Sequence, residues 1–255
     1  MDHTADELAV IVERANAQGR IVLVCEHASN TIPERFENLG LSTDQQQAHI
    51  AWDPGALALA RGLSERLDAV LIHAGMSRLI YDLNRPPHAA GAMPARSEVY
   101  DIPGNAQISP AERLARTNAI YLPFHDRLRH EIARRLALGL DPVLVTIHSF
   151  TPVYFGQQRA VEFGVIHDAD PRLAQAVVEA APENLITRLN EPYSAADGVA
   201  HTLAVQATPM GIANVMLEVR NDLIADPAAQ SAMAERLAPV LARALARISP
   251  PQAGQ

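Results

Sequence analysis

The sequence predicts an α/β protein, in which a mostly parallel mixed sheet is covered by helices on both faces. Short, nearly all-apolar runs of strand length recur along the chain, and segments with helical spacing of apolar residues lie between most of them. Strands that alternate with helices indicate parallel strands joined by crossovers. Because no linker or internal repeat interrupts the 255 residues, we expect one domain over residues 1–255.

The first third of the chain supplies three of these strands. Residues 5–18 have helical spacing, which predicts a helix that places Leu8, Ile11, Val12 and Ala15 on one face. Residues 21–25 form an apolar run typical of a buried strand. A loop is expected over residues 27–31, because Pro33 interrupts any regular element that follows. Asp53 followed by Pro54 predicts a capped helix start, with the helix ending near Leu67. Further strands are expected at residues 69–73 and 79–83.

The rest of the chain repeats the alternation after a long loop. Residues 86–109 are rich in Pro, Gly and Ala and predict a surface loop of the kind that covers sites. A helix should begin after Ser109 and continue to about Leu138, with a break or kink at Pro123. Strands are expected at residues 142–147, 161–166, 185–189 and 213–219, and helices at residues 171–181, 197–208 and 226–248.

Composition narrows the class of protein. The formal net charge of −8 argues against general affinity for nucleic acid or anionic membranes. Every cationic side chain is Arg, which excludes Schiff-base chemistry on a lysine. The single cysteine, Cys25, cannot form an intramolecular disulfide, and the acidic start lacks the order of a signal peptide. No segment has the length of a membrane span, so we expect a cytoplasmic protein, monomeric or a small homo-oligomer.

Two histidines and a glutamate each close or interrupt an apolar run. His27 follows the run at residues 21–25, His148 follows residues 143–147, and Glu218 lies within residues 215–219. Polar groups at the carboxyl ends of strands are where open α/β sheets build active sites. The histidines could ligate a metal or be ordinary loop histidines. Glu218 could be a general base, or it could pair with a structural arginine such as Arg220.

A second group of candidates surrounds Asp82. Arg78 and Arg85 could each bind an anionic substrate, or they could form an internal salt bridge with Asp82. Asp53 could be a third metal ligand or the helix cap. Cys25 and His27 are two residues apart and would share a strand face, so a Cys–His amidase is the rival mechanism, although most cysteines in apolar runs are inert. His201 could contact substrate, but its place near a helix start favours a capping or surface role.

Four segments resemble the N-formylglutamate amidohydrolase (deformylase) family, in the family's order and across roughly residues 20–225. They are EHASNTIP at 26–33, SRLIYDLNRP at 77–86, HSF at 148–150 and LEVRND at 217–222. The resemblance implies a fold related to the zinc carboxypeptidases and aspartoacylase, and a place in histidine degradation. It departs from those relatives in having Asn30 where a ligand glutamate is expected, and Cys25-Glu26 where a proline precedes the histidine.

By this resemblance a divalent metal, with zinc as the first candidate, would be held by His27 and His148, with Asp53 as the candidate third ligand. Glu218 would be the catalytic base and Arg78 the oxyanion donor. Asn84 and Arg85 would bind the substrate carboxylate, and Ser149 and His201 complete the candidate substrate contacts. The expected reaction is hydrolysis of the N-formyl or N-acyl amide of a small acidic amino acid such as N-formyl-L-glutamate. The alternatives are metal-independent catalysis by Cys25 and an inactive protein that binds a small carboxylate.

Overall fold

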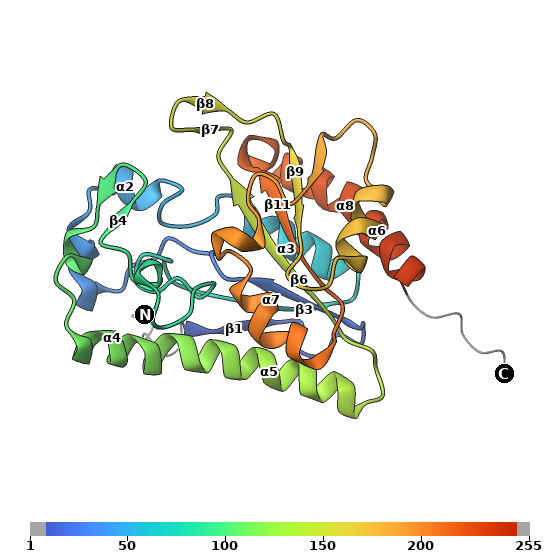
Figure 1. The fold of residues 1–255 in the computed structure, drawn as a ribbon, viewed down its shortest axis with the longest axis horizontal. Helices are drawn as coiled ribbons and strands as arrows, with labels where there is room; N and C mark the ends of the chain where they lie inside the picture. The colour runs from blue at the N-terminus through green and yellow to red at the C-terminus, as the bar shows by residue number, and fades with distance from the viewer. Residues whose placement is uncertain (1–8, 249–255) are drawn as a thin grey trace.

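A seven-stranded sheet forms the centre of the structure, a computed structural model that describes residues 9–248 (Figure 1). The strand order is β1-β3-β2-β6-β11-β9-β10, and the central strands β3, β2, β6 and β11 run parallel. β1 and β9 each join this group antiparallel, and β10 runs parallel to β9. The bounds are Ile11–Glu13 for β1, Ile21–Cys25 for β2, Val70–His73 for β3, Val143–Phe150 for β6, Phe163–Ile166 for β9, Thr187–Leu189 for β10 and Asn214–Arg220 for β11.

Helices cover both faces of the sheet because the central strands are apolar on both sides. In β2, Leu23 and Cys25 belong to the core shared with α3 (Ala56–Arg66), α6 (Arg172–Ala180) and α8 (Pro227–Ile248). The alternate residues Val22 and Val24 belong to the opposite core, shared with α5 (Leu122–Ala137) and α7 (His201–Gln206). This two-sided burial is what strands of a parallel sheet require. Among the described residues, no helix is both long and apolar enough to cross a membrane.

Two small hairpins lie outside the main sheet. One pairs β4 (Arg96–Ser97) with β5 (Tyr100–Asp101), and the other pairs β7 (Val153–Tyr154) with β8 (Gln157–Gln158). The β7–β8 hairpin extends from the end of β6, and Figure 1 shows β4 and α2 (Thr43–Gln47) at the upper left of the molecule. The remaining helix, α4 (Pro110–Arg116), precedes α5.

The predicted fold class is confirmed, and so are most of its elements. The strands at β2, β3, β6, β9 and β11 and the helices α3, α6 and α8 lie within a few residues of the predicted ranges. Ser109 caps α4 as predicted, since its hydroxyl accepts a hydrogen bond from the backbone N–H of Glu112. The expected break falls before Pro123, at a π-helical segment over Thr117–Tyr121, and Pro123 then occupies the first turn of α5.

Three local predictions are wrong. Residues 11–13 form the edge strand β1 rather than a helix, because β-branched Ile11 and Val12 pair with β3; residues 5–8 of that prediction lie outside the described residues. Residues 79–83 are turns, since no strand pairs with them. Asp53 does not cap α3: the helix begins at Ala56 after Gly55 in the left-handed conformation (φ 81°).

Candidate active site

The carboxyl ends of the central strands bring the candidate residues together. His148 in β6 and Glu218 in β11 are direct neighbours in the parallel register. In both strands the flanking residues, such as Ile147 and Leu217, belong to the core with α3 and α8. The strand alternation therefore sends His148 and Glu218 to the other face of the sheet. Because His27 follows β2, which pairs with β6, its side chain reaches the same place.

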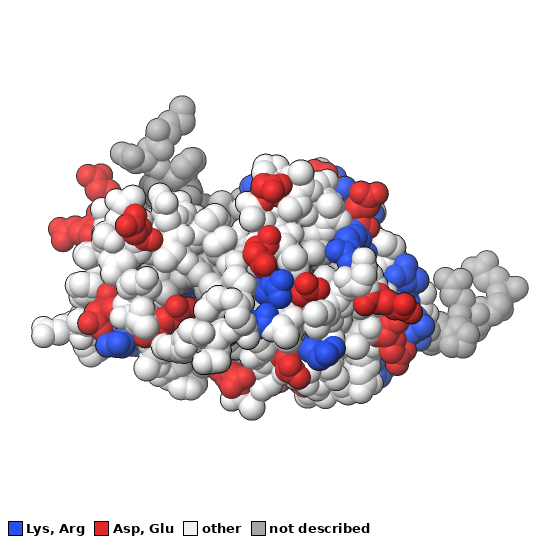
Figure 2. Space-filling view, turned by 90° about the horizontal axis from the view of Figure 1, so that it is seen from above, with Lys and Arg blue, Asp and Glu red and all other residues white. Residues whose placement is uncertain are grey.

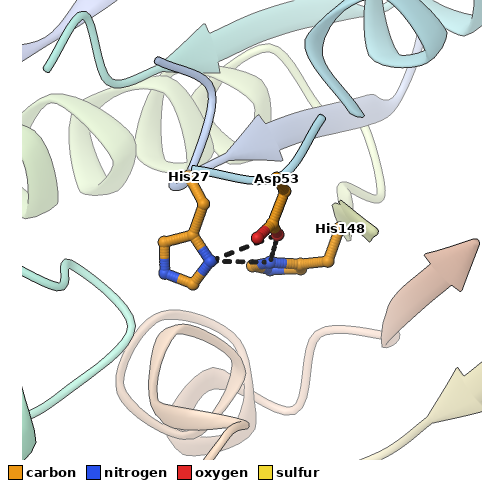
Figure 3. A group of neighbouring side chains, drawn as sticks. All are labelled: His27, Asp53 and His148. Atoms are coloured by element: carbon orange, nitrogen blue, oxygen red, sulfur yellow. Dashed lines mark hydrogen bonds and ion pairs between the residues drawn. The ribbon is translucent and has the colours of Figure 1, made fainter. Parts of the chain in front are cut away.

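His27, Asp53 and His148 form a compact buried cluster (Figure 3). The Nδ1 atoms of the two histidines lie 3.2 Å apart, and Asp53 Oδ2 lies 3.3 Å from that of His27 and 3.0 Å from that of His148. A backbone hydrogen bond of 2.9 Å from Asp53 N–H to His27 C=O joins the two loops that carry them. Three potential ligand atoms thus face one another.

The far nitrogen of each imidazole meets a carboxylate. His27 Nε2 and Asp82 Oδ1 lie 2.7 Å apart, and His148 Nε2 and Glu26 Oε2 lie 3.2 Å apart. Because an ionised carboxylate only accepts hydrogen bonds, these contacts favour a proton on Nε2 of both rings. The lone pair of each Nδ1 is then directed into the cluster. Carboxylates behind ligating histidines orient metal sites in this way.

The cluster carries excess negative charge, which a cation would balance. Burial opposes ionisation of Glu26, Asp53 and Asp82, but the neighbouring histidines and, for Asp82, Arg78 lower the pKa of all three carboxyls. Three carboxylates against one guanidinium leave two negative charges in excess. Protons on the two imidazoles can neutralise them: burial lowers the pKa of His148, but Glu26 and Asp53 outweigh it and raise that pKa well above its usual range. A dication can do the same.

The donor atoms also fit a zinc-like ion. Ligands about 2.0 Å from zinc in a tetrahedral arrangement lie about 3.3 Å from one another. The three separations within the cluster are 3.0, 3.2 and 3.3 Å. Two imidazole nitrogens and one carboxylate oxygen are a ligand set that catalytic zinc sites use. The residues present therefore fit a metal ion by spacing, by charge and by donor type.

Glu218 lies beside this cluster with an unusual carboxyl. It is 4% exposed, and its Oε2 has no hydrogen-bond partner in the described part of the chain. Burial raises the pKa of Glu218, His148 opposes this, Asp53 adds to it, and the pKa comes to about 7. Arg220 is not its partner, because that guanidinium pairs with Asp222 and Glu162. A carboxyl with a pKa near neutrality is suited to accept and return a proton.

Arg78 is both salt-bridged and exposed to the cavity. Its guanidinium donates to Asp82 Oδ2 at 2.6 Å and to Asp53 Oδ1 at 3.4 Å, and 23% of its side chain is exposed. The internal salt bridge considered for Arg78 and Asp82 is thus present. A guanidinium has five N–H donors, so these two contacts leave others for a ligand.

Asn84 and Arg85 connect the site to the loop before α7. The Asn84 side-chain amide donates to Val199 C=O and accepts from Thr202 N–H at 2.9 Å. Arg85 Nη1 donates to Gly198 C=O. Both ends of the Asn84 amide are therefore engaged with the backbone, whereas Arg85 keeps donors that face the cavity.

Other candidates differ in how closely they approach the cluster. Ser149 N–H contacts Asp53 Oδ2 at 3.3 Å, and its hydroxyl donates to Pro54 C=O at 2.8 Å. His201 Nε2 lies 2.9 Å from the Tyr121 hydroxyl and is not among the residues that line the cavity. Asn30, at the position where the resemblance led us to expect a ligand glutamate, donates to Gln46 C=O at 3.0 Å.

The cysteine mechanism finds no support in this geometry. β2 ends at Cys25, so the expected common face with His27 is wrong, and the thiol lies in the core with α3 and α8. It is fully buried and does not line the cavity. Burial, reinforced by Asp53 and Glu26, raises the pKa of the Cys25 thiol well above its usual range. A nucleophilic thiolate requires the opposite.

Two residues of the site were missed by sequence reasoning. Glu26 is fully buried behind His148, and a signal was available, because a charged residue directly after a buried strand needs a partner. His49 lines the cavity with Nδ1 3.8 Å from Asp53 Oδ1, and burial lowers its pKa to about 4. The sequence around His49 carries no signal of this placement.

The cluster opens into a cavity of about 310 Å³. Its wall includes His27, Asp53, Arg78, Asn84, Arg85, His148, Ser149 and Glu218, with Arg96, Ser97 and Glu98 from the β4–β5 hairpin region and Tyr154 from β7. The face of the molecule seen from above carries acidic and basic side chains side by side rather than one extended patch of a single sign (Figure 2). A cavity of this size suits a small ligand.

A mostly parallel α/β sheet with a buried His-Asp-His group and a neighbouring glutamate at its carboxyl edge defines a hydrolase-type site that could bind a metal. The family model for N-formylglutamate amidohydrolase matches residues 19–225. The chain therefore belongs to the N-formylglutamate amidohydrolase family, whose members are hydrolases that act on amide bonds.

Solved structures share the fold of this chain. The gene product Atu2144 from Agrobacterium tumefaciens is 53% identical, with a TM-score of 0.94 over 97% of this chain and 99% of that one. An N-formylglutamate amidohydrolase from Ralstonia eutropha JMP134 is 15% identical, with a TM-score of 0.68 over 94% and 98% of the two chains, which shows a shared fold. No curated protein matched the chain.

Proposed function

We propose that this protein is a metal-dependent amidohydrolase that removes the N-formyl group, or another small N-acyl group, from an acidic amino acid such as N-formyl-L-glutamate. The observation that supports this proposal most directly is the cluster of His27, Asp53 and His148. Their potential ligand atoms lie 3.0–3.3 Å apart, beside Glu218. Family membership supports the amide bond as the point of cleavage.

A divalent metal such as zinc, held by His27, His148 and Asp53, would polarise the amide carbonyl and lower the pKa of water in the site. Glu218 would accept the proton of the attacking water. It would then return this proton to the nitrogen of the departing amine. Its pKa of about 7 allows both transfers near neutral pH, because the protonated and ionised forms are then comparable in free energy.

Two arginines would orient the substrate. Arg78 faces the cavity and would donate a hydrogen bond to the developing oxyanion, while Asp53 and Asp82 hold its guanidinium in place. Arg85 would bind the substrate carboxylate through the donors that Gly198 leaves free. Asn84 would support this contact by fixing Val199 and Thr202 in the adjacent loop.

The experiment is a substrate and metal panel on the same preparation. Hydrolysis of N-formyl-L-glutamate, N-formyl-L-aspartate, N-acetyl-L-glutamate and N-formyl-L-leucine is followed by release of the free amino acid. The proposal predicts turnover of the acidic substrates that a chelator abolishes and zinc or cobalt restores. Turnover that survives complete metal removal would refute the metal requirement, and a preference for N-formyl-L-leucine would refute the substrate class.

A further inference from the structure

Glu26 is a buried carboxylate that the proposed chemistry does not use. It is 1% exposed, and neither of its carboxyl oxygens has a well-formed hydrogen bond in the described part of the chain. Its ion-pair contact is with His148, at 3.2 Å between Oε2 and Nε2. Burying a carboxylate with so little compensation costs several kcal/mol. We therefore expect Glu26 to have a specific role in the site.

The strand register explains how Glu26 comes to lie behind His148. Val24 of β2 pairs with Thr146 of β6 in the parallel ladder. Continuing this register by two residues places Glu26 opposite His148. His148 in turn pairs with Glu218 of β11. The imidazole is therefore flanked by one glutamate from each neighbouring strand, and only Glu218 lines the cavity.

The two histidines are held in the same way by different carboxylates. Asp82 meets Nε2 of His27, but it also accepts from Arg78 and from Asn84 N–H, so it has structural duties of its own. Glu26 makes no comparable contact with an arginine among the described residues. Its ion-pair partner is His148, and the Thr202 side chain adds a neutral contact.

We propose that Glu26 is a positioning residue that keeps the proton of His148 on Nε2 and thereby turns the Nδ1 lone pair toward Asp53 and His27. This inference rests on the proposed function, since the lone pair matters because a metal ion would be bound there. A carboxylate partner also makes the imidazole a stronger donor, and loss of such partners typically weakens metal binding about 10- to 100-fold.

The test compares two substitutions of Glu26. Glu26→Gln keeps an acceptor for Nε2–H but removes the charge, and Glu26→Leu removes both at similar size. Removing one partner of a buried ion pair is typically strongly destabilising, so folding of both variants is checked by circular dichroism, and zinc binding by Glu26→Gln decides the test if Glu26→Leu does not fold. Glu13→Gln is the control, because Glu13 also contacts a histidine, His73, at 3.0 Å from its Nε2 and away from the cavity, while it pairs with Arg61 as well.

Two readouts are taken that do not depend on turnover. The dissociation constant for Zn²⁺ is measured by competition with a chromophoric chelator. The nitrogen that carries the proton of His148 is identified in the metal-free protein by long-range ¹H–¹⁵N correlation spectra, assigned by the signals that His148→Gln loses. The spectra are recorded along a pH series that extends above the raised pKa of His148, because only the neutral ring carries a single proton. We expect zinc binding about 10-fold weaker in Glu26→Gln and about 100-fold weaker in Glu26→Leu. Glu13→Gln should match the wild type, and only Glu26→Leu should lose the preference for a proton on Nε2.

Failure of the inference and failure of the proposed function are distinguishable. If the wild type binds zinc and both Glu26 variants bind it equally well with Nε2 still protonated, Glu26 does not position His148. If the wild type binds no zinc, the proposed metal requirement fails, and the NMR result alone decides this inference. In that case an unchanged Nε2–H in Glu26→Leu overturns it, and its loss supports it.

Discussion

Replacing Glu218 by Gln should make the metal-free protein more stable at alkaline pH while it destroys turnover. The buried carboxyl has a pKa of about 7, against an ordinary value of 4.5. One pKa unit corresponds to about 1.4 kcal/mol, so ionising Glu218 in the folded protein costs about 3 kcal/mol more than in the unfolded chain. Gln has no charge to bury and avoids this cost.

The sign of the pH dependence follows from the raised pKa. Below about pH 4.5 the carboxyl is protonated in both the folded and the unfolded chain, and it carries no penalty. The penalty grows as the pH rises from there to about 7 and stays constant above. Glu218→Gln should therefore raise the free energy of unfolding by about 3 kcal/mol at pH 8 and by less than about 1 kcal/mol at pH 5.

The assay is urea unfolding of chelator-treated wild type and variant at pH 5 and pH 8, beside turnover of the zinc-loaded proteins. Loss of a general base lowers kcat typically by 10²- to 10⁴-fold, and we expect a loss of about that size with zinc content unchanged. Equal stability of the two proteins at pH 8 would refute the raised pKa. Near-full turnover in Glu218→Gln would remove Glu218 from the mechanism.

Three further outcomes follow from the site. The value of kcat/KM should rise with pH and then level off, because the ionised form of Glu218 accepts the proton, and a bound dication should place this rise below the pKa of about 7 of the metal-free protein; a value that falls as the pH rises from about 5 to 8 would contradict this. Arg85→Ala should raise KM for N-formyl-L-glutamate about 10- to 100-fold with a smaller change in kcat, because charge-assisted hydrogen bonds contribute about 1.5–3 kcal/mol. An unchanged KM would show that the substrate carboxylate binds elsewhere. Cys25→Ala should lower the free energy of unfolding in urea by about 1 kcal/mol and leave kcat within about twofold, because the thiol belongs to the core; loss of activity without loss of stability would revive the cysteine mechanism.

The parts of the fold that the sequence predicted are those where burial dominates. Apolar runs such as residues 21–25 and 143–147 are strands because both faces of the central sheet are covered. The polar residues that end or interrupt these runs, His27, His148 and Glu218, therefore had to lie near one edge of the sheet. Their mutual proximity follows from parallel strand order, which the alternation of strands and helices indicated.

The errors arise where tertiary pairing decides. Residues 11–13 have apolar spacing compatible with a helix, but the exposed edge of β3 accepts Ile11 and Val12 as a strand. Residues 79–83, which are apolar except for Asp82, resemble a strand locally, yet their backbone pairs with no strand of the described sheets. A strand needs a partner, and one sequence does not show which edges are free.

Within the site, the sequence could not separate a cap from a ligand. Asp53 before Pro54 satisfies the local pattern of a helix start, but the folded chain directs its carboxylate to His27 and His148. For Glu26 the sequence shows only that a charged residue after a buried strand needs a partner; which partner it has depends on the register between β2 and β6. Contacts across strands are a property of the sheet rather than of any segment.

The most direct test of the central claim is the metal content of untagged protein, measured per chain beside His27→Ala and His148→Ala. The account predicts about one zinc-like ion per chain in the wild type, because the cluster offers one set of ligand atoms 3.0–3.3 Å apart. Each variant should lose the ion. A wild-type protein that holds no metal even after reconstitution, or variants that retain it in full, would contradict a metal site at His27, Asp53 and His148.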